Sequence, residues 1–314
     1  MRHSLRAILD SMRSRPLLPL IGVTGAIVWA YWPTLCEIAG KWSHDPQYSH
    51  GYFVPAFAVY LLWQRRKLAP ATCTPNWWGA ALLLVAVSLR GGGALFYNDW
   101  LDAVSLLPLL SGVVLLLGGW PMLRWSWLAI GFLIFMIPLP FRLEHGLAHP
   151  LQRVATLTAT YTLQTLGFPT FAEGNVIHVR QASIGVVEAC SGLGMLLLFF
   201  ALATGVAILT RRPFLDKVLI VASAAPVAVL ANVIRITTTA FLHVIAGSRW
   251  ADLVFHDLAG YLMMPLALGM LWVELWLLRR LLIERPLPSL APIRLVIPQS
   301  SGPRRRPRRA RVPR

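Results

Sequence analysis

Eight long apolar blocks dominate the sequence and constrain what it can fold into. They cover residues 17–36, 50–63, 77–97, 100–119, 125–141, 191–210, 217–245 and 257–278. About 20 apolar residues in a helix cross the hydrocarbon core of a bilayer, which is about 30 Å thick. Only 13% of the residues are charged, whereas a soluble domain usually has about 25%. The pattern predicts an all-α polytopic membrane protein with about eight transmembrane helices, of which the second is the shortest.

The basic residues predict how these helices are oriented. They gather before the first block, after the last one, and in the loops at 65–67, 124 and 211–217. With an even number of crossings, all of these clusters fall on one side, which the positive-inside rule assigns to the cytoplasm. Both termini are therefore expected in the cytoplasm of a bacterial cell, beneath its inner membrane. The segments 37–49, 98–99, 142–189 and 246–256 are expected on the periplasmic side.

The chain is predicted to hold one domain and a tail. Residues 1–283 form a single membrane-embedded domain, whose first helix is retained because no small-residue cleavage site follows it. Residues 284–314 are rich in Pro and Arg, cannot build a core and predict a disordered cytoplasmic tail. The net charge of +16 is concentrated between the apolar blocks and at the two ends. It therefore favours contact with anionic lipid over binding to nucleic acid.

The longest predicted periplasmic segment, 142–189, contains two patterns. Residues 142–168 mix apolar and polar side chains at helical spacing, as in a helix that lies along the membrane interface. Residues 174–180 and 184–190 are rich in alternating β-branched side chains and predict a short β-hairpin before the sixth helix. The hairpin would place Cys190 at the periplasmic end of that helix.

Three chemically active residues are predicted at one depth, near the outer boundary of the membrane. Cys190 begins the sixth helix, Arg235 lies about 27 Å along the seventh from its cytoplasmic entry, and His256 opens the eighth. A helix N-terminus and a cationic neighbour favour the nucleophilic thiolate, and a histidine can protonate a leaving amine. Arg235 and the backbone N–H groups of Ser191 and Gly192 would stabilise an oxyanion. Purely structural roles explain the same residues about equally well. Cys190 would be a small apolar side chain that fills space, Arg235 would extend its charge to the membrane surface, and His256 would be an ordinary interfacial residue.

Two further groups of polar residues are expected on the periplasmic side. His145 and His149 are spaced as on one helix face, but no HExxH motif is present and Pro150 follows directly. We therefore predict no metal site and no other cofactor. Asp45 and His50 precede the second helix, where they either shape a substrate entrance or belong to a solvated loop.

Four sequence segments resemble the signatures of a known family. The segments EACSGLG (188–194), NVIRI (232–236) and HDLAG (256–260) resemble, in order and spacing, three motifs of the exosortase and archaeosortase family of membrane transpeptidases. The segment DPQYSHGYFVPAFAVYLLWQRR (45–66) resembles that family's N-terminal signature. The resemblance extends from about residue 20 to 283.

The resemblance implies a membrane enzyme that cleaves the C-terminal sorting tails of exported proteins on the periplasmic side. Such tails join a short motif, a transmembrane helix and a basic end, as in PEP-CTERM proteins. By resemblance, Cys190 is the nucleophile, Arg235 stabilises the transition state and His256 is the acid and base. Asn232, one helical turn before Arg235, belongs to the second motif and would orient the guanidinium.

Two other classes of function are compatible with the residues. A non-enzymatic transporter or export and assembly factor would place polar groups near the bilayer midplane, often with an internal repeat. Here the polar groups gather at one face, and no repeat is visible. A transferase acting on lipid-linked sugars would depend on acidic or histidine residues in the outer loops. An essential acidic pair combined with a dispensable Cys190 would favour the transferase.

Overall fold

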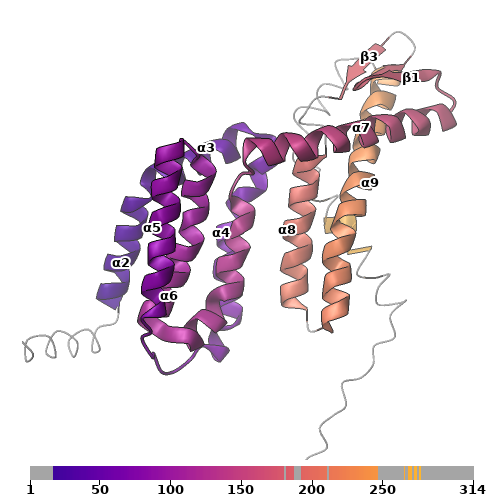
Figure 1. The fold of residues 1–314 in the computed structure, drawn as a ribbon. Coiled ribbons are helices and arrows are strands. Elements are labelled where there is room, and N and C mark those ends of the chain that lie inside the picture. The colour runs from indigo at the N-terminus through magenta and orange to yellow at the C-terminus, as the bar shows by residue number, and fades with distance from the viewer. Residues whose placement is uncertain are drawn as a thin grey trace, which may run out of the picture. The chain divides into compact units, whose positions relative to one another are not determined.

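The computed structural model describes residues 17–179, 182–186, 192–210 and 212–246, together with residues 265, 268–270, 272, 273 and 276. Most of these residues are helical, and one small antiparallel sheet follows helix α7 (Figure 1). The elements named below belong to one compact unit, Met1–Val273, and the remainder, Glu274–Arg314, forms a second unit. The predicted tail at 284–314 lies outside the described residues.

Three of the described helical segments are long and apolar enough to cross a membrane. They are Trp78–Phe96, Asp99–Met136 and Phe214–Ile245. Helix α4, with 12 residues, is only about 18 Å long, which is less than the thickness of the hydrocarbon core. The prediction of a helical membrane protein is confirmed, whereas a total of eight crossings is not confirmed by the described residues.

The first part of the membrane unit consists of helices joined by short 3₁₀ segments. The helices are α2 (Leu17–Ala30), α3 (Trp32–His44), α4 (Phe53–Gln64), α5 (Trp78–Phe96) and α6 (Asp99–Phe132). The 3₁₀ segments are η1 (Pro46–Tyr52), η2 (Arg66–Leu68) and η3 (Leu133–Met136). The predicted first crossing, 17–36, is thus divided between α2 and α3. Pro33 lies in the first turn of α3, where its missing N–H is tolerated, but it cannot continue a preceding helix.

Helix α6 contains the fourth predicted crossing and the first part, 125–132, of the fifth. Gly119 breaks the helix with φ +76° and ψ −173°, and the ribbon of α6 changes direction along its length (Figure 1). A Cβ at this position would lie 1.9 Å from the carbonyl oxygen of Thr74, so only glycine fits. The loop that the sequence predicted between the two crossings is therefore a kink within one element.

A polar network joins α3, α5 and α6. The Arg90 guanidinium lies 3.5 Å from the Asp102 carboxylate, which also accepts a hydrogen bond from the Thr34 hydroxyl. Arg90 also lies over the ring of Tyr31, whose hydroxyl is 2.8 Å from that of Ser105. Charged groups among apolar helices are expensive unless they are paired, and this network pairs them.

The second part of the unit contains α7 (Phe141–Thr165), a three-stranded sheet, α8 (Leu193–Leu209) and α9 (Phe214–Ala246). The strands are β1 (Thr170–Glu173), β2 (Val176–Val179) and β3 (Ala182–Gly185), antiparallel and in the order β1-β2-β3. The hairpin predicted at 174–180 and 184–190 is confirmed in part, because β2 and β3 pair in antiparallel fashion. The structure corrects it in two respects: β3 begins at 182, and β1 is an additional strand. The residues Gly174-Asn175 form the tight connection between β1 and β2, with Gly174 at φ +60°.

Helix α7 confirms the helix predicted over 142–168. Its small and polar residues, including Ala155, Thr156 and Ala159, are buried against the rest of the unit. Its larger apolar residues, including Leu147 and Val154, remain exposed on the protein surface. This exposed stripe is the one that the sequence assigned to the membrane interface.

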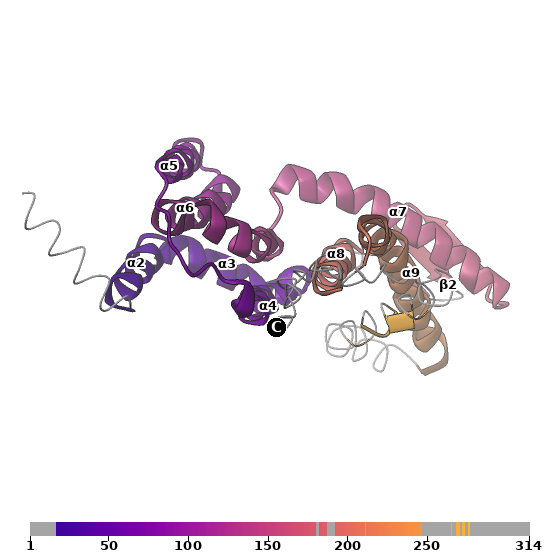
Figure 2. The ribbon, with the colours of Figure 1, turned by 90° about the horizontal axis from the view of Figure 1, so that it is seen from below.

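Helices α8 and α9 lie side by side, and α7 crosses them (Figures 1 and 2). A common core holds α7, the sheet and α9 together. Its buried members are Ala155, Ala159, Leu163, Ile177, Val179, Val186, Ile236 and Ala240. This core fixes the sheet against the two helices that flank the predicted site.

Candidate functional site

The first residue of the candidate site is the glycine that caps α8. Gly192 has φ +90°, a conformation that glycine adopts readily and other residues rarely adopt. A Cβ on Gly192 would lie 2.9 Å from the side-chain nitrogen of Asn232 in α9. The start of α8 therefore approaches α9 so closely that a side chain at this position would collide with Asn232.

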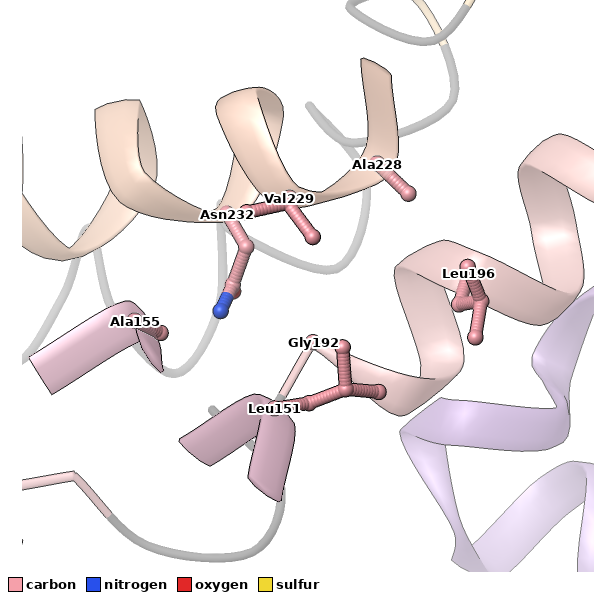
Figure 3. A pocket seen from close by; sticks show the side chains of 7 residues that line it. All are labelled: Leu151, Ala155, Gly192, Leu196, Ala228, Val229 and Asn232. Carbon is pink, nitrogen blue, oxygen red and sulfur yellow. The ribbon is translucent and has the colours of Figure 1, made fainter. Parts of the chain in front are cut away.

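Asn232 is the polar member of a small pocket where three helices meet. The pocket is lined by Leu151 and Ala155 of α7, Gly192 and Leu196 of α8, and Ala228, Val229 and Asn232 of α9. Figure 3 shows the Asn232 side chain reaching from α9 toward Gly192 and α7. Asn232 is only 1% exposed, and its amide can both donate and accept hydrogen bonds. The pocket thus offers one fixed polar group in apolar surroundings.

Arg235 lies one helical turn beyond Asn232 on α9. It is half-buried, and its carbonyl oxygen accepts a hydrogen bond from the Thr239 hydroxyl at 2.9 Å. It lies 21 residues after Phe214, which corresponds to about 32 Å along the helix. Arg235 is therefore displaced from the end of α9 at Phe214 by about the thickness of a hydrocarbon core.

The segment η1 contacts the first turn of α8 from another side. A Cβ on Gly194 would lie 2.9 Å from the Cα of Gln47, so the two backbones are in close contact. The side chain of Asp45 accepts a hydrogen bond from the Gln47 N–H at 2.9 Å and caps η1. The side-chain oxygen of Gln47 is buried and has no hydrogen-bond partner among the described residues. The 3₁₀ segment within DPQYSHGY is thus in contact with the start of α8, where the EACSGLG segment ends.

His50 anchors η1 from within. It is 5% exposed, and burial lowers the pKa of its imidazole, while hydrogen bonds to the backbone of Phe135 and Gln47 oppose that shift. Tyr48, also buried, accepts a hydrogen bond from the Leu139 N–H at 3.2 Å. Of the two interpretations of Asp45 and His50, a freely solvated loop does not fit the burial of His50.

Helix α7 fixes the chain on the other side of residues 187–191. The Gln152 side-chain amide donates a hydrogen bond to the Val186 carbonyl, and Gln152 is 5% exposed. The Val186 N–H donates to the Asn175 carbonyl at 2.8 Å. The backbone is therefore held at Val186 by α7 and the sheet, and at Gly192 by contact with α9.

The structure brings together only some of the predicted site residues. Gly192 and Asn232 are in contact, and Arg235 follows on the same helix. Cys190, Ser191 and His256 lie outside the described residues. The convergence of all of these groups in one pocket therefore stays a prediction.

Two positioning residues were not singled out from the sequence. Gln47 lies within the segment that resembles the family's N-terminal signature, but nothing local marks it as a neighbour of α8. Gln152 had a weak signal, since it lies opposite the apolar stripe of α7 on a face of small residues. A buried glutamine on such a face needs a hydrogen-bond partner, and here the partner is the backbone at Val186.

Comparison with known proteins identifies one family. The model of the family described as transmembrane exosortase (Exosortase_EpsH) matches residues 42–273. The matched range includes η1, the start of α8, and the Asn232 to Arg235 turn of α9. No curated protein and no solved structure matches the chain.

Proposed function

The chain belongs to the transmembrane exosortase family, and on that premise we propose that it is a membrane cysteine protease or transpeptidase. Its substrates are exported proteins that end in a sorting tail with its own transmembrane helix. Cleavage takes place on the periplasmic side of the inner membrane, through Cys190, Arg235 and His256.

In the proposed reaction, the Cys190 thiolate attacks the carbonyl carbon of the scissile peptide bond. Arg235 stabilises the oxyanion of the tetrahedral intermediate. The C–N bond then breaks, and His256 gives a proton to the departing amine, which leaves with the transmembrane tail. The resulting thioester is resolved by an acceptor amine or by water, which restores the thiol.

The contact between Gly192 and Asn232 is the observation that carries this proposal. Cys190 precedes Gly192 by two residues, and two peptide units span at most about 7 Å. We therefore expect the Cys190 thiol to lie close to the turn of α9 that carries Asn232 and Arg235. An arginine side chain is long enough to act across such a distance, and apolar surroundings strengthen its interaction with an oxyanion.

The exposed stripe of α7 supports access from the membrane. A tail with its own transmembrane helix has to reach the enzyme by lateral diffusion in the bilayer. Leu151 of α7 lines the pocket, while Leu147 and Val154 on the same helix are exposed. An apolar substrate helix can therefore contact this stripe next to the pocket.

Replacement of Cys190 tests the function. The substrate is an exported protein from the same genome that ends in a short motif, an apolar helix and a basic cluster, with an epitope tag placed after the tail. We expect Cys190→Ala and Cys190→Ser to abolish loss of the tag on immunoblots at unchanged enzyme levels. Cys36→Ser and Cys73→Ser are matched controls, since both cysteines are free and exposed. Normal cleavage in both Cys190 variants would remove the enzyme hypothesis.

A further inference from the structure

A second cleft lies in the first part of the unit, between α3, the start of α6 and the segment that leads into α7. Its volume is about 550 Å³, within the range of about 300 to 1,000 Å³ that is typical of ligand sites. It shares no lining residue with the pocket at Asn232. We propose that this cleft binds the headgroup of an aminophospholipid, in which an ammonium group lies next to a phosphate.

One wall of the cleft is acidic. The carboxyl groups of Glu37 and Asp99 line it, and they are close enough for the charge of Asp99 to act on Glu37. Burial, and then the charge of Asp99, raise the pKa of Glu37. Nearby Asp102 is already paired with Arg90. A ligand ammonium, which has several N–H donors, would bind both Glu37 and Asp99 and relieve their mutual repulsion.

Other residues of the cleft are basic. Lys41 lies one helical turn after Glu37, and Arg142 lies where the chain enters α7. Both line the same cleft as the two carboxylates. Lysine and arginine are the usual partners of phosphate oxygens. The cleft therefore presents both charges that a zwitterionic headgroup requires.

The position of the cleft indicates that its ligand belongs to a lipid. Helix α5 ends at Phe96 and α6 begins at Asp99, and both are long and apolar enough to cross a membrane. The turn between them, with Tyr97 and Asn98 in the cleft wall, therefore lies where the hydrocarbon ends. Trp100 lines the cleft as well, and Tyr97 is 94% exposed. Tyrosine and tryptophan are enriched at this depth, which is also the depth of lipid headgroups.

Binding of short-chain lipids by the purified full-length protein in detergent tests the proposal. We expect phosphatidylethanolamine to bind at least about tenfold more tightly than phosphatidylglycerol, which has no cation. Phosphatidylcholine should also bind more weakly, because its trimethylammonium group has no N–H to donate. Equal binding of all three lipids by the wild-type protein would overturn the proposal. Free phosphoethanolamine that bound as tightly as the lipid would overturn the lipid as the source of the headgroup.

Removing the two carboxylate charges of the cleft tests whether the lipid binds there. The double variant Glu37→Gln with Asp99→Asn should lose about tenfold or more in affinity for phosphatidylethanolamine and retain its weak affinity for phosphatidylglycerol. Glu173→Gln is the matched control, since this carboxylate is exposed on β1. Unchanged binding of phosphatidylethanolamine by the double variant would exclude this cleft. The proposal does not depend on the proposed protease function, because neither readout requires cleavage.

Discussion

The two parts of the membrane unit use their buried polar side chains differently. In α2 to α6, Arg90 and Thr34 both bind Asp102 and so tie helices together. In α7 to α9, by contrast, Gln152 holds the backbone at Val186, and Asn232 lies against Gly192. The first arrangement stabilises helix packing. The second fixes the chain on both sides of residues 187–191, and so it is the second part that we expect to control chemistry.

Replacing one arginine in each part gives the largest expected contrast. Arg235→Lys should lower tail cleavage by at least about 100-fold, because an ammonium cannot reproduce the planar fork of a guanidinium at an oxyanion. Arg90→Lys should leave cleavage within about twofold of wild type and lower the thermal unfolding midpoint, because it weakens the bond to Asp102. Cleavage assays and unfolding in detergent, run on both variants, measure the contrast. If Arg235→Lys kept normal activity, Arg235 would have a structural role like that of Arg90.

A smaller effect is expected from Gly192→Ala. The left-handed backbone costs a residue with a Cβ about 1 to 2 kcal/mol, and the new methyl group would press against Asn232. We expect about a tenfold loss of cleavage, because the start of α8 moves relative to α9. Gly146→Ala in α7 is the control, since a Cβ there meets nothing within 4 Å. Equal activity of the two variants would show that the contact at Asn232 does not matter for catalysis.

The smallest expected effect concerns pH and the anchoring of η1. Burial holds the pKa of His50 below its ordinary value. As the pH falls, His50 is therefore protonated in the unfolded chain at a higher pH than in the native state. The native state should therefore lose stability as the pH drops below about 6.5, by at most about 1.4 kcal/mol per pH unit from this group. His50→Gln should flatten the profile of unfolding midpoint against pH between 7 and 5. Identical slopes in the two proteins would contradict the burial of a neutral His50.

Much of the helical architecture was predictable because hydropathy is local. The apolar blocks at 77–97, 191–210 and 217–245 correspond closely to α5, α8 and α9. Strand β1 was missed because its four residues, 170–173, carry no clear alternation. The signal that was available is the pair Gly174-Asn175, which favours a tight connection between two strands.

The motifs around Cys190, Arg235 and His256 identified the family from the sequence, and the family model confirms that identification. The contacts that define the site were not predictable in the same way. Gln47 reaches the start of α8 across about 150 residues of chain, and Gln152 reaches Val186 across 34. Such contacts depend on how closely whole helices approach, which no local pattern records.

The sequence by itself determined that this protein is helical, lies in a membrane and belongs to the transmembrane exosortase family. These properties follow from the length of the apolar blocks and from short motifs, both of which are local. The tertiary structure alone decided where the chain bends at Gly119, which backbone Gln152 holds and how closely Gly192 approaches Asn232. These features depend on steric exclusion between segments that are distant in the sequence, and such exclusion exists only once the helices have packed.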